Sequence, residues 1–422
     1  MKLISTSSRG AQTQLAALFT RRSLTYERAL PSSRRIVEAV RAGGDAALRR
    51  YATRLDHLSS QSPLRISPDE LSAAWANAPT SFKRALETSA KNIRAFTERQ
   101  RPKEWDFSPV GGLTVGQRVR PLDAVGCYVP SGRYPLPSTL LMTVIPAQVA
   151  GVQRIVIASP HPARETLAAA GMLGISEFYR IGGAQAIAAL AYGTETIASV
   201  DKIVGPGNAY VTAAKKLVAF DCAIDMLAGP TEIVVTSENG NPKWIAADLV
   251  AQAEHDPNAL AIFVTTTVTL ARGVFAEVKR QSRSNPVARE AIRHNGLAIL
   301  AKNVTEAREI INRLAPEHLI VDTPADLEWI RNAGSVFIGP FSAEPLGDYI
   351  SGPNHTLPTG GLARVRGGLS VADFLKIITV QQYQPAGLST LGPKAIVLAE
   401  AEGLHGHTEA IRIRLPEARG SR

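Results

Sequence analysis

The chain has very little cysteine and no long apolar segment. Its 422 residues include only two cysteines, Cys127 and Cys222, which are far apart. Zinc fingers and disulfide-rich domains need several closely spaced cysteines, so both classes are disfavoured. No run of about 18 apolar residues occurs, which argues against a membrane span. The first residues turn polar too early for a secretory signal peptide. We therefore expect a cytoplasmic protein with reduced thiols.

The sequence also lacks a recognisable nucleic-acid-binding module. Lys and Arg number 47 against 37 Asp and Glu, for a formal net charge of +10. These basic residues are scattered and are not interleaved with aromatic residues. A solvated surface, or mild attraction for an anionic cofactor, explains the charge as well. With 45% hydrophobic and 20% charged residues, the composition is that of a globular protein, and the length predicts two or more domains.

Apolar periodicity changes along the chain. Residues 23–101 have apolar side chains three and four positions apart, which predicts helices. From residue 123 onward, short apolar runs are followed by tight turns and Ala-rich helical segments, the order expected of a parallel sheet. The predicted strands are 124–129, 154–158, 177–181, 201–204, 232–236, 261–264, 297–300 and 319–321. The predicted helices after residue 180 are 184–192, 209–218, 242–255, 305–314 and 372–378.

Two glycine turns, at residues 182–183 and 205–208, each follow a predicted strand and open a helix. The second turn has two glycines of the Gly-x-Gly-x-x-Gly fingerprint, with Tyr210 where the third belongs. Taken alone, a plain strand-to-helix turn explains this pattern better than a dinucleotide site. The position nevertheless favours phosphate, because helix N-terminal N–H groups point toward it. We expect a pyrophosphate held differently from that in typical dehydrogenases.

A candidate metal site comes from mixed nitrogen and oxygen donors. If 242–255 forms one helix, Gln252 and His255 project from the same face. A surface pair is the alternative, since Gln is an unusual ligand. Asp348, in a segment expected to be a loop, could add a hard oxygen ligand. The other histidines near this set are His355, His405 and His407, with His294 unassigned. Such a mixture is compatible with Zn²⁺.

Glu317 and His318 form a candidate acid/base pair. Pro316 precedes them and ends helical hydrogen bonding, so we expect the pair in a loop, where catalytic side chains usually lie. A zinc peptidase is disfavoured because no His-Glu-x-x-His occurs. A non-enzymatic module with a structural metal is disfavoured too, because structural zinc sites are usually rich in thiolates. For His57 and His161 we expect surface or core roles.

Six segments in this order resemble the histidinol dehydrogenase family. They are residues 182–193 (GGAQAIAALAYG), 205–211 (GPGNAYV), 224–232 (IDMLAGPTE), 252–255 (QAEH), 315–319 (APEHL) and 354–361 (NHTLPTGG). The resemblance runs from about residue 30 to 415. It implies an NAD-dependent enzyme of histidine biosynthesis that oxidises L-histidinol to L-histidine through L-histidinal. It also implies one Zn²⁺ per subunit and a homodimer whose exchanged C-terminal tail reaches the partner's site.

The resemblance assigns roles residue by residue. The implied zinc ligands are Gln252, His255, Asp348 and His407. The implied catalytic pair is Glu317 and His318, and the implied NAD contacts are Tyr128, Gln185 and Asn208. The implied substrate contacts are Thr231, Gln252, His255, His318, Asp348, His355, Glu402 and His407. His407 is preferred to His405 because Glu402 then keeps the family's five-residue spacing.

One position departs from the family. Thr231 stands where the family usually has serine; the hydroxyl remains, but the extra methyl narrows the pocket. Related enzymes oxidise other small alcohols, including a sulfonated propanediol, so the alternative is the same fold and chemistry on such a substrate. Glu402 favours histidinol, because its carboxylate suits a cationic amino alcohol.

The expected fold is α/β. It has two Rossmann-like parallel-sheet domains, incomplete and duplicated, with a helical N-terminal segment and a C-terminal extension. The expected boundaries are 1–25 for an N-terminal extension, 26–127 plus 232–370 for a larger domain with the zinc and catalytic residues, 128–231 for an NAD-binding domain, and 371–422 for the tail.

Overall fold

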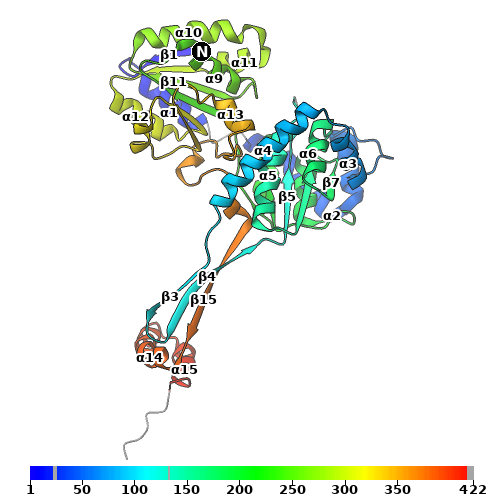
Figure 1. The fold of residues 1–422 in the computed structure, drawn as a ribbon, viewed down its shortest axis with the longest axis vertical. Helices are drawn as coiled ribbons and strands as arrows, with labels where there is room; N and C mark the ends of the chain where they lie inside the picture. Colours follow the sequence, from blue (N-terminus) through cyan, green and yellow to red (C-terminus); the bar gives the residue numbers. More distant parts are fainter. Residues whose placement is uncertain (22–25, 132–133, 416–422) are drawn as a thin grey trace, which may run out of the picture. The chain divides into compact units, whose positions relative to one another are not determined.

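The computed structural model describes residues 1–21, 26–131 and 134–415 (Figure 1). The chain divides into two compact units. The first comprises Met1–Gln100 and Leu122–Phe374, and the second comprises Arg101–Pro121 and Leu375–Arg422. The candidate metal, catalytic and NAD residues before position 371 therefore all lie in the first unit.

The first unit contains a six-stranded parallel sheet, here named sheet A. Its order is β1 (Lys2–Ser5), β12 (Leu297–Leu300), β11 (Leu260–Thr265), β10 (Glu232–Thr236), β13 (His318–Val321) and β14 (Ser335–Ile338). Ile233 and Val235 pack in one core, whereas Val234 packs in another. Alternate side chains of β10 thus point to opposite faces, and both faces are covered.

Five helices cover sheet A. The first core includes residues of α9 (Pro242–Ala253), α10 (Val268–Gln281) and α11 (Pro286–Asn295). The second core includes residues of α1 (Ala11–Arg21) and α12 (Val304–Leu314). Asn241 caps α9, and Pro242 occupies its first turn, as the sequence predicts.

The same unit contains a second six-stranded sheet, sheet B. Its order is β2 (Arg65–Ile66), β7 (Glu177–Tyr179), β6 (Arg154–Ala158), β5 (Ala124–Tyr128), β8 (Lys202–Val204) and β9 (Ala223–Ile224). Only the edge strand β2 is antiparallel to its neighbour. Sheets A and B repeat one strand order, with the first strand in the middle and one added edge strand. The predicted duplicated Rossmann-like layout is therefore confirmed.

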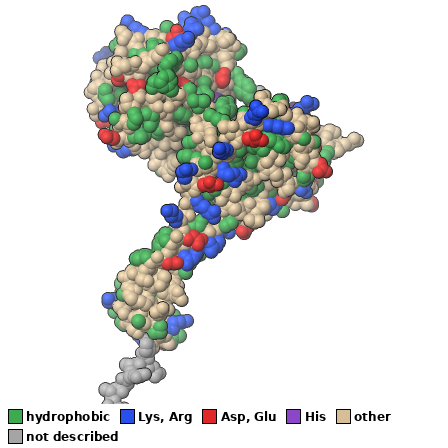
Figure 2. All heavy atoms as spheres, in the orientation of Figure 1, with side chains coloured by type: hydrophobic (Ala, Val, Ile, Leu, Met, Phe, Trp, Pro, Cys, Tyr) green, Lys and Arg blue, Asp and Glu red, His purple; other side chains and the backbone are tan. Residues whose placement is uncertain are grey.

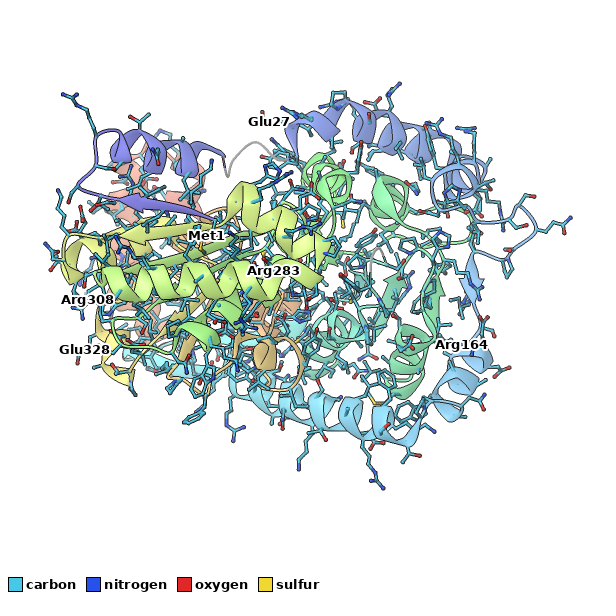
Figure 3. All side chains as sticks on the ribbon, turned by 90° about the horizontal axis from the view of Figure 1, so that it is seen from above. Met1, Glu27, Arg164, Arg283, Arg308 and Glu328 are labelled. Carbon is cyan, nitrogen blue, oxygen red and sulfur yellow. The ribbon has the colours of Figure 1, made fainter. Side chains whose placement is uncertain are left out.

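Helices surround sheet B as well. They are α2 (Leu30–Leu55), α3 (Pro68–Ala76), α4 (Thr80–Arg99), α5 (Pro137–Ala150), α6 (Arg164–Met172), α7 (Gly183–Tyr192) and α8 (Ala209–Val218). Figure 3 shows Arg164 of α6 in this part, and Arg283 and Arg308 in the part built on sheet A. Helix α2 packs on α7 and α8, α3 on α6, and α4 on α5.

This packing differs from the expected domain boundaries. The helices of residues 30–99 lie with sheet B, whereas the sequence grouped residues 26–127 with 232–370. Residues 2–5 are the edge strand of sheet A and not a separate extension. Amphipathic periodicity shows that a helix has a buried face, but it does not identify the sheet that buries it.

The second unit has its own antiparallel sheet. Strand β4 (Leu113–Pro121) pairs with β3 (Trp105–Val110) on one side and β15 (Leu375–Tyr383) on the other, and α14 (Pro385–Ala401) and α15 (His405–Arg412) follow. The predicted helix at 372–378 is wrong. Residues Val371–Phe374 form a 3₁₀ turn, and β15 begins at Leu375. Residues 377–380, Ile-Ile-Thr-Val, are β-branched and favour a strand.

Charged side chains of both signs are mixed on the visible surface. Figure 2 shows Lys and Arg side chains spread over the visible face and interspersed with Asp and Glu, without one large basic patch. None of the helices in the described residues has the length and apolarity needed to span a membrane. Cys127 and Cys222 are both free and buried.

Candidate active site

The candidate catalytic residues meet at the amino ends of two neighbouring strands. Thr231 directly precedes β10, Glu317 directly precedes β13, and Ile233 is in register with His318. The Thr231 hydroxyl donates to Glu317 Oε2 at 2.6 Å, and the Glu232 N–H donates to the same oxygen at 2.8 Å. Two segments 86 residues apart in the sequence are joined in this way.

The Glu-His pair lies at a helix-to-strand junction. Helix α12 ends at Ala315, which adopts a left-handed conformation with φ 46°, and Pro316 prevents its continuation. Only Glu317 is outside regular structure; His318 is the first residue of β13, so its expected loop position is wrong. Because the next strand starts at once, the His318 backbone is held by sheet hydrogen bonds. A catalytic imidazole held by a strand is well ordered.

His318 is buried in a polar shell. Its Nδ1 lies 3.3 Å from the Glu232 carbonyl oxygen and 3.4 Å from Gln252 Nε2. The Phe337 ring lies against the imidazole, with centroids 6.0 Å apart. Burial lowers the pKa of His318 to about 4. The imidazole is therefore neutral near pH 7 and can accept a proton.

Gln252 and His255 do not lie in one continuous helix, contrary to the prediction from the sequence. Helix α9 ends at Ala253, so the predicted helix 242–255 is too long and the two residues do not share a helical face. Pro257 follows closely and disfavours helix for the residue before it. Gln252 donates its amide N–H to Thr231 Oγ1, which leaves Gln252 Oε1 buried without a hydrogen-bond partner. His255 Nε2 still lies 3.6 Å from Asp348 Oδ2.

Asp348 is at the centre of the cluster. It lies in the short helix α13 (Glu344–Tyr349), not in the expected loop. Its Oδ1 is 4.0 Å from His318 Nε2 and 3.8 Å from His355 Nδ1. His355 Nδ1 also lies 3.0 Å from the Asp348 carbonyl oxygen, and its Nε2 lies 3.3 Å from Thr139 Oγ1 of α5. Residues from elements associated with both sheet A and sheet B therefore surround Asp348 and His355.

Glu344 is a site residue that sequence reasoning missed. It is completely buried, and its Oε1 lies 3.3 Å from His318 Nε2. Burial, followed by the negative neighbours Asp348, Glu317 and Asp248, raises the pKa of Glu344 to about 9. Its four-residue spacing from Asp348 could have revealed it, because carboxylates four apart share one face of a helix.

The pKa of Glu317 is raised in the same direction. Burial is the main cause, and the negative charges of Glu232 and Asp348 add to it. The hydrogen bonds from Thr231 and from the Glu232 N–H partly oppose this shift. Burial also lowers the pKa of His355. Burial therefore favours the neutral forms of both the carboxyl groups and the imidazoles in this site.

The donors fit a divalent metal. Gln252 offers a buried amide oxygen without a partner, and the carboxylate of Asp348 lies 3.6 Å from the imidazole of His255. A second grouping is possible, since donor atoms of His318, Glu344 and Asp348 all lie within 4.8 Å of one another. We favour the first set, because Gln252 Oε1 is buried without a hydrogen-bond partner and a bound metal would supply one.

The two predicted tail residues lie in the second unit. Glu402 follows α14 as its C-terminal cap, and His407 is in α15. Both side chains are exposed.

The residues expected to contact NAD lie at the carboxyl edge of sheet B. Tyr128 ends β5, Asn208 follows β8, and Gln185 is in the first turn of α7 after β7. The Tyr128 hydroxyl accepts from the Gly183 N–H at 3.1 Å, and Asn208 Oδ1 caps α8 by accepting from Tyr210 N and Val211 N. Strands β5 and β8 flank the point where the strand order reverses, where nucleotides bind in such sheets.

Aspartate carboxylates accept hydrogen bonds from the backbone of the two glycine turns at this edge. Asp56, which sequence reasoning missed, accepts from the Gly182 N–H at 3.0 Å and from Gln185 Nε2 at 2.9 Å. The Gly205 N–H donates to Asp225 Oδ2 at 2.7 Å, and Asp225 forms a buried ion pair with Lys215. These contacts fix the backbone of both turns.

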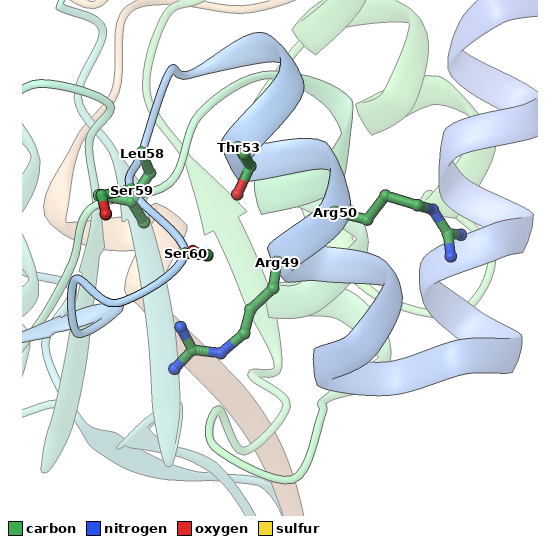
Figure 4. Close-up of a pocket in the computed structure, with 6 residues that line it drawn as sticks. All are labelled: Arg49, Arg50, Thr53, Leu58, Ser59 and Ser60. Carbon is green, nitrogen blue, oxygen red and sulfur yellow. The ribbon is translucent and has the colours of Figure 1, made fainter.

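A cavity of about 360 Å³ opens at the catalytic cluster. Its lining includes His318, Asp348 and His355 together with Phe337 and Phe341. A second cavity, of about 290 Å³, lies between the end of α2 and the loop after it (Figure 4). Arg49 and Ser59 are among its lining residues, but it contains none of the candidate site residues. The chemistry therefore belongs to the first cavity.

Comparison with known proteins agrees with this geometry. Residues 19–415 match the family model for histidinol dehydrogenase. The chain is 46% identical over 416 residues to a histidinol dehydrogenase of Methanothermobacter thermautotrophicus, covering 95% of this chain and 97% of that protein. It is 48% identical over 392 residues to that of Geobacillus kaustophilus, covering 90% and 92%. The crystal structure of histidinol dehydrogenase from Elizabethkingia anophelis superposes with a TM-score of 0.92 at 35% identity and covers 98% of both chains. The chain belongs to the histidinol dehydrogenase family.

Proposed function

We propose that the chain oxidises L-histidinol to L-histidine through L-histidinal, with NAD as hydride acceptor and one zinc ion per subunit. The observation that carries this proposal is the convergence of Thr231, Gln252, Glu317, His318 and Asp348, linked by the contacts described above. The first oxidation converts the alcohol and NAD⁺ to aldehyde, NADH and a proton. Water then adds to the aldehyde, and the hydrate gives a second hydride and a second proton.

The zinc ion would be held by Gln252, His255 and Asp348, with His407 of the tail as fourth ligand. When bound, zinc orients and polarises the amino alcohol without changing its own redox state. The buried Gln252 Oε1 supports this assignment, because a bound metal would supply the partner that it lacks.

His318 would accept the hydroxyl proton as hydride leaves. Its neutral imidazole, lining the cavity, supports this role. Glu317 would then activate the water that hydrates the aldehyde, since its raised pKa makes the carboxylate a stronger base. His355 and Thr231 lie close enough to these groups to contact the substrate, and Glu402 would bind its cationic part.

NAD would bind at the carboxyl edge of sheet B, in contact with Tyr128, Gln185 and Asn208. The two glycine turns lead into the N-termini of α7 and α8, which supports a pyrophosphate site without a complete glycine fingerprint. We also propose a cytoplasmic location, where NAD is available and where free Cys127 and Cys222 remain reduced.

A homodimer with exchanged tails would complete the site. Val397, Leu398 and Ile413 of the second unit are 65%, 68% and 68% exposed, which is unusual for a solvated surface and supports cover by a partner. In the first unit, Trp244 and the strongly exposed Phe341 contact each other, and Phe341 also lines the cavity. An incoming tail that carries His407 could cover this apolar pair.

The test is the yield of NADH from each candidate substrate. The proposal expects two NADH per histidinol, one per added histidinal, and none from a sulfonated propanediol. No Lys or Arg is found among the described residues that line the catalytic cavity, although a sulfonate would need such a partner. Turnover of the sulfonated diol in preference to histidinol would replace the proposed substrate but leave the chemistry intact.

A further inference from the structure

Glu344 has no role in the reaction as proposed so far, although it is buried beside its base. Neither carboxyl oxygen has a hydrogen-bond partner among the described residues, and Oε1 lies 3.3 Å from His318 Nε2. A buried polar group without a partner is costly, so its retention calls for an explanation. It does not line the catalytic cavity, which argues against direct contact with the substrate.

Helix α13 fixes the position of Glu344 from several sides. The Glu344 N–H donates to Asp248 Oδ1 at 3.3 Å. The Ser89 hydroxyl and the Asn92 amide of α4 donate to the carbonyl oxygens of Tyr349 and Ile350 at 2.5 and 2.8 Å. The helix is thus held at both ends, and its carboxyl groups cannot move far without breaking these bonds.

The same helix packs against the ring that supports His318. A Cβ at Gly347 would lie 2.6 Å from the Phe337 ring, so the helix approaches this ring as closely as glycine allows. Phe337 in turn lies against the His318 imidazole. Helix α13 therefore carries Glu344 and Asp348 one turn apart, and both carboxyl groups face the His318 imidazole.

We propose that Glu344 is a positioning residue: its Oε1 is the acceptor that holds the His318 ring through Nε2 once that nitrogen carries the proton taken from the substrate. Nδ1 then donates to the Glu232 carbonyl oxygen, so both ring nitrogens have an acceptor. This inference rests on the proposed function of His318.

The proposal predicts different effects for two substitutions of Glu344. Glu344→Gln keeps an amide oxygen near Nε2, whereas Glu344→Leu removes the acceptor at similar volume. In the full-length, zinc-loaded protein we expect Glu344→Leu to lower kcat for histidinol about 10- to 100-fold, the usual cost of losing a residue that orients an active-site histidine. We expect Glu344→Gln to retain most of kcat. KM for histidinol and zinc content should stay close to the parent values in both.

Three outcomes would overturn the proposal. The first is full activity of Glu344→Leu. The second is equal impairment of the Gln and Leu variants, which would mean that the acid proton itself is required. The third is loss of zinc from both variants, which would make Glu344 a ligand. If Glu344→Leu does not fold, Glu344→Met tests the same point. If the parent protein does not oxidise histidinol, the proposed function fails separately. In that case ¹⁵N NMR of His318 in the metal-free variants, at a pH low enough to protonate the imidazole, still tests positioning. Exchange broadening should then appear with Leu and not with Gln, and its absence with Leu would contradict the proposal.

Discussion

At the residue scale, burial moves the site's acids and its imidazole in opposite directions. It raises the pKa values of Glu317 and Glu344 and lowers that of His318. Burial thus favours the neutral form of each of these groups, the protonated form of the two carboxyl groups and the unprotonated form of the imidazole. The hydroxyl of Thr231 bonds both Glu317 and Gln252, and so joins the catalytic pair to the proposed metal ligands.

Replacing Glu317 should affect the second oxidation more than the first. Glu317→Gln removes the carboxylate proposed to activate water, so we expect conversion of added histidinal to histidine to fall about 100-fold or more. Oxidation of histidinol to the aldehyde should fall less, because His318 remains. Rapid-mixing measurement of NADH from each substrate tests this, and an equal loss in both steps would remove the special role of Glu317.

The raised pKa of Glu344 predicts a particular dependence of stability on pH. A folded-state pKa above the unfolded value means that the folded protein binds this proton more tightly. Stability from this group is therefore present below about pH 4.5 and is lost as pH rises toward about 9. We expect metal-free Glu344→Gln to gain stability relative to the parent between pH 5 and pH 9 in urea unfolding. Glu309→Gln, at an exposed position of α12, is the control. A constant difference across this range would contradict the prediction.

At the element scale, the order of strands, turns and helices was predictable from the sequence. The elements against which each helix or strand packs were less predictable. Buried strands such as Glu232–Thr236 carry continuous apolar runs, and local signals such as Asn241-Pro242 mark helix starts. The end of α9 before His255, the helical setting of Asp348 and the strand at Leu375–Tyr383 were wrongly predicted. Local signals for the first and the third were present in Pro257 and in the β-branched residues 377–380. The candidate site could still be named, because the resemblance rests on motifs and not on element boundaries. Glu344 lies in none of those motifs and was missed.

The Gly205 turn gives a test of the NAD edge. Gly205 has φ 112°, and a Cβ there would overlap the Tyr128 carbonyl oxygen. We expect Gly205→Ala to destabilise the protein by about 2 kcal/mol or more and to raise KM for NAD more than KM for histidinol. Gly174→Ala is the matched control, because Gly174 also has positive φ but open space around its Cβ position. Thermal unfolding and steady-state kinetics measure both effects. An unchanged KM for NAD in Gly205→Ala would argue against a cofactor site at this turn.

At the scale of the whole molecule, the two duplicated sheets are proposed to serve different parts of the reaction. Sheet B offers its carboxyl edge to the proposed cofactor, whereas sheet A gathers its catalytic groups at the opposite, amino edge of β10 and β13. The proposed fourth zinc ligand lies in the second unit, which the sequence identified as a tail but whose sheet it did not predict. Pairing of β15 with β4 across more than 250 residues is a nonlocal contact that local patterns do not encode.

Tail exchange can be tested by subunit complementation. His318→Asn and His407→Asn should each be inactive alone. In a mixed dimer, the subunit with intact His318 would receive intact His407 from its partner, so one of the two sites would be complete. Because about half of randomly assembled dimers are mixed, about a quarter of parental activity should return. A mixture with His405→Asn in place of His407→Asn is the control for the choice of histidine. No recovery in the His318→Asn and His407→Asn mixture would show that each tail serves its own subunit.

The most direct test of the central claim is zinc titration of metal-depleted protein with histidinol and NAD present. The account predicts that NADH production rises in proportion to added zinc, saturates at one ion per subunit, and is lost when Asp348 is replaced by Asn. Full activity in the metal-depleted protein, or saturation unaffected by Asp348→Asn, would contradict it.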